Sequence, residues 1–440
     1  MQATTSRIPL PLYMQVLIAV AGGALLGALF GQEPYLGGLR NEQLGKLGLL
    51  VVSLLKTLAI PLIFFAILDA LIRTGIPLGQ GGKLLLICFV NVSVAMIIGL
   101  AIMNTWQPGL AWYGHVDELL HFVPGTKPSA AAVANLQAGA QSPIEYLASY
   151  IPRTIMEPFS SNNIIGVVLL ALVIGAILRY VQGESGEADG IVAVVVRAIA
   201  RIYGWLVQML EWIILAVPLA VFGVVAQVVG KSGVGVFSVL WIFLAAMLAG
   251  LAVHSLVYYP LVAWLVGKKS PKVYLGQGAD AIMTAVSCNS SLATVPVTLR
   301  CLERMQVSPQ SSRLAACVGT NLNNDGITLY EAMAALFLAQ ALGFDLPMAS
   351  QVVIVLASII AGAGVAGIPE AGLIVLPLVL SAAGLPDQVI LAAVPLIMTV
   401  DWIIARARSG VNVMSDMLVA ILLDAGRVPQ ATVPVSRSRE

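Results

Sequence analysis

The sequence predicts an all-α polytopic membrane protein with eight transmembrane helices and two re-entrant hairpins. Hydrophobic residues make up 59% of the 440 residues and charged residues only 10%. Several apolar runs reach the roughly 20 residues that a helix needs to cross the hydrocarbon core. Two further apolar segments are interrupted by glycine and proline, which break helices. The net charge of +1 argues against a nucleic-acid-binding protein.

Hydropathy places the spans in order along the chain. They are expected near 13–31, 46–72, 83–104, 163–182, 198–229, 234–267, 311–342 and 388–424. The first is expected to be a retained helix, because no cleavage site for a signal peptide follows it. Basic residues that flank the spans, such as Arg7 and Lys268, predict that both termini are cytoplasmic in a plasma membrane, most simply that of a bacterium.

Two interrupted segments predict the hairpins. Residues 273–300 contain a cluster of hydroxyl residues that ends at Pro296, and residues 350–384 contain four glycines and a proline between Ala361 and Gly372. Irregular backbone is tolerated at membrane depth only inside protein or beside a water-filled cavity. Broken helices in corresponding halves are typical of a transporter binding site. The alternative is a pair of kinked packing helices.

A third polar segment lies within the span 311–342. Asn321, Asn323, Asn324 and Asp325 are poor helix formers, so the helix is expected to unwind there. Free carbonyls and a carboxylate would form an oxygen-only site of the kind that hard cations prefer. Alternatively, the amides only bridge helices.

The last span carries several ionisable side chains, which are costly to place at membrane depth. At about 100° per residue, Asp401, Ala405, Arg408, Asn412 and Asp416 fall within roughly 60° of one another on a helix, whereas Arg406 points away. The guanidinium of Arg408 suits a carboxylate, and the Asp416 carboxylate suits a cation. The alternative is a structural ion pair between Asp401 and Arg408.

These motifs together resemble the dicarboxylate/amino acid:cation symporter family, the glutamate-transporter-like proteins, from the first span to about residue 425. The most specific matches are Leu55 to Phe65, Ser290 to Arg300, Asn323 to Gly326, Ala366 to Pro369 and Arg408 to Asp416. The resemblance implies a homotrimer with an elevator fold. Its scaffold would comprise 1–82 and 105–233, its transport domain 83–104 and 234–425, and its cytoplasmic tail 426–440.

The resemblance also implies the site residues. Those implied for the substrate are Ser290, Ser291, Ile327, Ala405, Arg408, Ser409 and Asn412. Those implied for co-transported sodium are Gly319, Asn321, Asn323, Asp325, Gly362, Ala363, Val365, Asn412 and Asp416. Glu331 matches the glutamate that carries a proton in proton-coupled relatives; its alternative role is a buried glutamate bonded to its neighbours.

Departures from the family pattern bear on the substrate. Ala405 replaces an aspartate that pairs with the substrate's ammonium in relatives that carry amino acids. We therefore expect a succinate-like or malate-like dicarboxylate, with an acidic amino acid as the alternative if Glu370 replaces the missing acid. The pocket is also more apolar, since Ile327 and Leu292 replace hydroxyl residues. At the third sodium site, Cys88, Asn91 and Val92 stand where hydroxyl side chains are expected.

The sequence thus predicts a secondary active symporter that couples inward sodium flow, with protons as a further candidate ion, to uptake of a small anionic substrate. An ion channel is a remoter alternative, because a channel would not need two closing hairpins. An enzyme is not expected, since no GxSxG element surrounds Ser290 or Ser291. His254 is expected to be a packing or interfacial residue.

Overall fold

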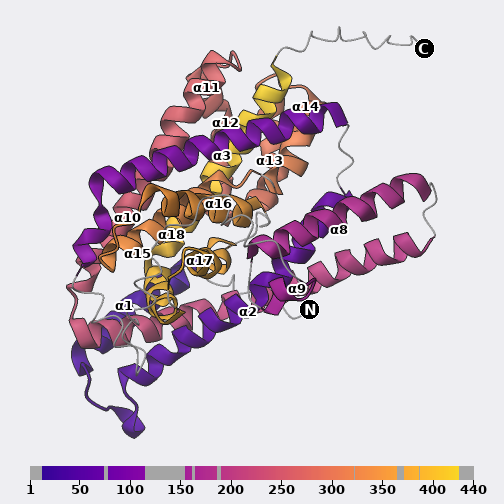
Figure 1. Cartoon of the computed structure of the whole chain (residues 1–440). Coiled ribbons are helices and arrows are strands. Elements are labelled where there is room, and N and C mark those ends of the chain that lie inside the picture. Colours follow the sequence, from indigo (N-terminus) through magenta and orange to yellow (C-terminus); the bar gives the residue numbers. More distant parts are fainter. Residues whose placement is uncertain are drawn as a thin grey trace, which may run out of the picture.

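The computed structural model describes residues 12–73, 78–113, 154–160, 164–185, 190–321, 323–363, 371–385 and 387–425. Within these ranges the chain is almost entirely helical, as predicted, and an isolated bridge between Tyr35 and Leu39 is its only β feature. The helices form two groups that pack against each other (Figure 1).

The first group contains four long helices, α1 (Leu12–Phe30), α2 (Asn41–Arg73), α8 (Ile164–Ser185) and α9 (Ile191–Ser232). Short helices η1 (Leu36–Gly38) and α7 (Glu157–Ser160) belong to its connections. Helix α2 packs against α8 and α9, and α1 packs along α9. The contact between α2 and α9 is close because Gly223 has no side chain: a Cβ there would meet the backbone of Leu44. In a bilayer the lipid tails are as apolar as the helix surfaces, so hydrophobic burial does not drive helices together. Small residues instead allow the two backbones to approach closely.

The second group is built around α18 (Asp387–Asp424), drawn in yellow in Figure 1. Around it lie α3 (Leu78–Trp106), η2 (Pro108–Trp112), α10 (Val236–Ala252), the π-helical segment η3 (Val253–Tyr258), α11 (Tyr259–Leu265) and α15 (Asp325–Ala341). Edge-to-face contacts of Phe337 with Trp112 and Phe243, at 5.2 and 4.9 Å between ring centroids, anchor this core.

Both interrupted segments form helix pairs. Helices α12 (Pro271–Cys288) and α13 (Ser291–Arg304) pack together and against α18. Helices α16 (Met348–Ala363) and α17 (Ala371–Ala382) form the second pair, with 364–370 outside the described residues. The first segment is thus broken, but at Asn289 and not at Pro296, which lies within α13. The predicted break of the second segment falls on 364–370, outside the described residues, and the placement of both hairpins at membrane depth stays a prediction.

The span 311–342 is broken as well. It comprises α14 (Pro309–Arg313), the π-helical η4 (Leu314–Val318), the 3-10 helix η5 (Gly319–Asn321) and then α15. Asn323 and Asn324 are not helical. The predicted unwinding at the asparagine cluster is thus observed, and it allows side chains and carbonyls to face α18.

Four helical stretches in the described residues are long and apolar enough to cross a membrane: 41–69, 81–106, 191–231 and 240–265. The other predicted spans are also helical but are shorter, broken or more polar, so the count of eight stays a prediction. Large apolar side chains such as Trp205, Trp212 and Leu215 are exposed along α9. An outward apolar face of this kind fits a multi-pass membrane protein.

The close contact at Gly223 gives a testable prediction. Gly223→Val should lower the free energy of unfolding by about 1–3 kcal/mol, because overpacking forces α2 and α9 apart. The measurement is denaturation of the detergent-solubilised protein. Gly204→Val on the same helix is the matched control, because a Cβ there meets nothing within 4 Å. Equal losses in the two variants would contradict the packing argument.

Candidate substrate and cation site

Helix α18 carries a buried cation at the centre of the second group. Arg408 is 2% exposed, and its Nη2 donates to Oδ2 of Asp401 at 3.0 Å. Its Cζ lies 4.1 Å from the ring centroid of Tyr330 on α15. The ion pair named as the alternative for these residues is therefore formed in this structure. Because guanidinium groups bind carboxylates through two parallel donors, Arg408 remains suited to an acidic ligand.

The tip of the first hairpin lies against the same helix. Asn289 has a positive φ of 53°, which asparagine tolerates well, and this residue turns the chain between α12 and α13. Ser290 then caps α13, its hydroxyl accepting from the amide of Ala293 at 3.1 Å. Ser409 of α18 donates to Oδ1 of Asn289 at 2.9 Å. This contact brings the predicted hairpin serines beside the polar face of α18.

Asn412 connects α18 to the unwound segment and, through it, to the second hairpin. Its Oδ1 accepts from the amide of Gly326 at 2.9 Å, and its Nδ2 donates to Oδ1 of Asn324 at 3.3 Å. Asn324 in turn donates to the carbonyl of Gly362 at 3.1 Å. Three segments far apart in sequence, namely α18, the unwound segment and the end of α16, thus meet through one chain of amide hydrogen bonds.

Buried oxygen atoms gather one turn further along α18. Asp416 is 2% exposed and its Oδ1 accepts from Nδ2 of Asn323 at 3.4 Å. Among the described residues, Oδ1 of Asn323 and Oδ1 of Asp325 find no hydrogen-bond partner. Buried unpaired oxygens are costly unless something binds them. Carbonyl, amide and carboxylate oxygens are ligands that a hard cation prefers, so this region fits sodium.

Asp325 lies in a denser polar cluster than the sequence suggested. Its Oδ2 accepts from the hydroxyls of Tyr259 at 2.8 Å and Ser415 at 2.7 Å, and Nε2 of His254 lies 3.4 Å away. His254 is fully buried and stacks on Tyr258, so it packs as predicted but also reaches the site. The π-helical turn of η3 brings these residues of the span 234–267 toward Asp325, a register that periodicity does not reveal.

The remaining residues predicted for the cation sites have known positions in the fold or lie outside the described residues. Gly319 and Asn321 lie in η5, and Gly362 and Ala363 lie in the last turn of α16. Val365 falls in 364–370, outside the described residues, as does Glu370. At the expected third cation site, Asn91 is buried, and its Oδ1 accepts from the hydroxyl of Tyr258 at 3.0 Å.

Two of the residues predicted for the substrate site, one on α15 and one on α18, are apolar. Ile327 is 4% and Ala405 1% exposed, and neither offers a hydrogen-bonding side chain. Glu331 is fully buried, and both of its carboxylate oxygens find no hydrogen-bond partner among the described residues. The alternative of a glutamate bonded to its neighbours therefore gains no support from the described part of the chain.

Comparison with known proteins identifies the family. The sequence profile of the sodium:dicarboxylate symporter family matches residues 12–425. The chain belongs to that family. It is 28% identical over 446 residues to excitatory amino acid transporter 3 of Mus musculus, covering 92% of this chain and 83% of that protein. It is 26% identical over 426 residues to the putative sodium-dependent excitatory amino acid transporter glt-4 of Caenorhabditis elegans, covering 86% and 81%.

Family membership confirms the resemblance found in the sequence and, with it, co-transported sodium. This symporter family and the relatives named above are transporters and not enzymes. The expectation of a plain dicarboxylate receives less support than its alternative, because the relatives are named as excitatory amino acid transporters.

Asp416 allows the cation site to be tested directly. Sodium should raise the thermal midpoint of the wild-type protein above its value in equal concentrations of choline, since a ligand bound to the native state stabilises it. Asp416→Asn should lose most of that increment, because a carboxylate is removed from the oxygen cluster. Asp280→Asn, at an exposed acid on α12, should keep it. An undiminished sodium effect in Asp416→Asn would exclude Asp416 as a ligand.

Proposed function

We propose that this symporter couples sodium entry to the uptake of a small acidic substrate, and that the substrate is an acidic amino acid such as aspartate or glutamate. The buried guanidinium of Arg408 is the observation that carries the proposal: it lies beside Gly372 near the start of α17, and the adjacent Ser409 contacts the tip of the first hairpin. The substrate class is taken from the similarity to excitatory amino acid transporters.

Arg408 would exchange partners during binding. Without substrate, the charge of the guanidinium is balanced by Asp401 and by the face of the Tyr330 ring. A substrate carboxylate would take up donors of the same planar group, which holds several N–H bonds in a fixed geometry. Ser290, Ser291, Ser409 and Asn412 would hold the other carboxylate with hydroxyl, amide and backbone donors.

Sodium would bind close to the same hydrogen-bonded chain. In the proposed arrangement, Asn323 and Asp416 provide oxygen ligands, with carbonyls of Gly319 and Asn412. Asn323 directly precedes Asn324, which contacts both Asn412 and Gly362. An ion that orders Asn323 would therefore also order the residues that line the substrate, which is a physical basis for coupling. The homotrimer, the elevator movement and the division into scaffold and transport domain remain part of this proposal.

A plain C4 dicarboxylate is the second candidate, and Ala405 is the observation that favours it. The ammonium of an amino acid needs an acceptor, and the buried methyl group of Ala405 supplies none. An acidic amino acid would have to place its ammonium on neutral oxygens of the hairpin tips or on Glu370. A substrate without an amine avoids that requirement.

Competition in proteoliposomes distinguishes the two substrates. We expect sodium-driven uptake of labelled aspartate, with weak inhibition by succinate. Ala405→Asp should raise the affinity for aspartate by about tenfold or more, because a charge-assisted hydrogen bond contributes roughly 1.5–3 kcal/mol, and it should not improve succinate. Faster uptake of succinate than of aspartate by the wild type would instead establish the plain dicarboxylate.

Glu331 is proposed to carry a proton with the substrate. At a fixed sodium gradient, acidification outside the vesicles should accelerate uptake by the wild type. Glu331→Gln should abolish that response, because an amide neither gains nor loses the proton. Glu33→Gln, at an exposed acid between α1 and α2, is the control and should respond like the wild type. A wild type indifferent to the proton gradient would exclude this role.

A further inference from the structure

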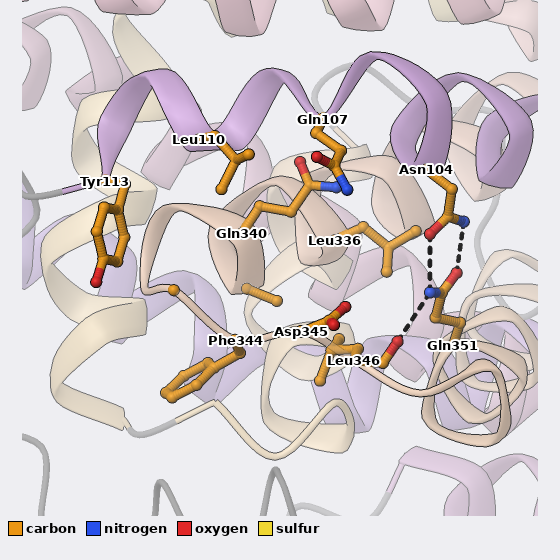
Figure 2. A pocket seen from close by; sticks show the side chains of 12 residues that line it. Asn104, Gln107, Leu110, Tyr113, Leu336, Gln340, Phe344, Asp345, Leu346 and Gln351 are labelled. Carbon is orange, nitrogen blue, oxygen red and sulfur yellow. Dashed lines mark hydrogen bonds between the residues drawn. The ribbon is translucent and has the colours of Figure 1, made fainter.

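A cavity lies apart from the residues assigned to substrate and sodium. It has a volume of about 290 Å³, is partly open, and is lined by the end of α3, η2, the end of α15, the connection that follows it and the start of α16 (Figure 2). None of its lining residues belongs to the site described above. Its volume is about twice that of the roughly 150 Å³ cavity that accommodates benzene, so it can hold a bicyclic ring with a short arm.

Reciprocal amide hydrogen bonds fix one wall of this cavity. Asn104 of α3 donates to Oε1 of Gln351 at 2.7 Å, and Nε2 of Gln351 donates back to Oδ1 of Asn104 at 2.9 Å (Figure 2). Gln340 connects Met103 to Gly109. Its Nε2 donates to the carbonyl of Met103 at 2.7 Å, and its Oε1 accepts from the amide of Gly109 at 3.0 Å. The walls are therefore held by bonds that do not depend on a ligand, and the cavity is preformed.

The ionisable charge in the cavity lining is negative. Asp345 is its only acidic residue, and no lysine or arginine is present among the described residues that line it. Leu336, Phe344 and Leu346 are buried and supply apolar surface. Pockets for small molecules combine such apolar walls with a few polar groups that orient the ligand. A carboxylate beside apolar and aromatic surface favours an organic cation over an anion.

We propose that this cavity is a binding site for a small organic cation with an aromatic body, whose ammonium is held by Asp345 while its ring lies against Leu336 and Leu346. The site takes the opposite charge to the acidic substrate of the transport pathway. It depends on neither the sodium coupling nor the identity of that substrate, so its test stands independently of the proposed function.

Three indole compounds of similar size provide the test: tryptamine as the cation, N-acetyltryptamine as the neutral form and indole-3-propionate as the anion. Titration calorimetry on the purified full chain in detergent should give saturable binding of tryptamine, weaker binding of N-acetyltryptamine and the weakest binding of indole-3-propionate. The absence of saturable tryptamine binding, or equal affinity for the anion, would overturn the proposal.

Two variants locate the site. Asp345→Asn should lower the affinity for tryptamine by about tenfold, as expected for loss of a charge-assisted hydrogen bond. It should leave the affinity for N-acetyltryptamine unchanged. Leu110→Trp should weaken both compounds by filling the mouth; Leu110 is 49% exposed, so the fold should tolerate the larger ring. Glu33→Gln is the control for loss of a distant acid. Tryptamine affinity that survives both Asp345→Asn and Leu110→Trp would place binding elsewhere and refute the assignment.

Discussion

The burial of Arg408 is the constraint on which the site depends. A guanidinium that is 2% exposed loses most of its hydration, and such a charge is tolerated only when it is paired and hydrogen-bonded. Asp401 supplies the paired charge from the preceding turns of α18, and the Tyr330 ring supplies a π face. In the proposed function, a substrate carboxylate would therefore not meet a bare cation. It would replace part of an existing interaction, so discrimination would come from geometry as much as from charge.

The broken helices follow from the same requirement. A continuous helix satisfies its own amides and carbonyls and offers none to a ligand. Where α15 begins at Asp325, the amide of Gly326 is free to reach Asn412, and Asn324 reaches the carbonyl of Gly362. The polar face of α18 thus becomes a meeting point for both hairpins. The sodium ligands proposed on the same unwound segment would share these contacts, so that cation and substrate would influence each other without a long pathway.

Local features of this arrangement could be predicted from the sequence, and non-local ones could not. The break near Asn323 follows from residue types within a few positions, and the face of α18 follows from helical spacing alone. The first hairpin is also expected from the sequence, but its turn lies at Asn289, while Pro296 continues α13. The hydroxyls of Tyr259 and Ser415 around Asp325 come from helices 66 and 90 residues away, and the register of Tyr259 follows a π-helical segment. The cavity beside Asn104 and Gln351, which are 247 residues apart, depends likewise on tertiary packing.

Ala405 shows where family similarity and local chemistry give different answers. Identity of 26–28% to excitatory amino acid transporters over most of the chain concerns mainly the framework of helices and hairpins. The charge inside the site depends on single residues.

The charges of substrate and site can be compared directly. A plain dicarboxylate carries one more negative charge than an acidic amino acid, and Ala405 removes one negative charge from the site relative to an aspartate. These two changes compensate each other, so the pocket with Ala405 plus a dicarboxylate has the same net charge as a pocket with aspartate plus an amino acid. An acidic amino acid bound beside Ala405 breaks this balance, and the surplus positive charge would have to be met elsewhere. A Glu331 that carries a proton with the substrate, as proposed above, is neutral and leaves that charge to other groups, whereas an ionised Glu331 would meet it. The proton state of Glu331 and the choice of substrate are therefore linked by charge balance within one buried site.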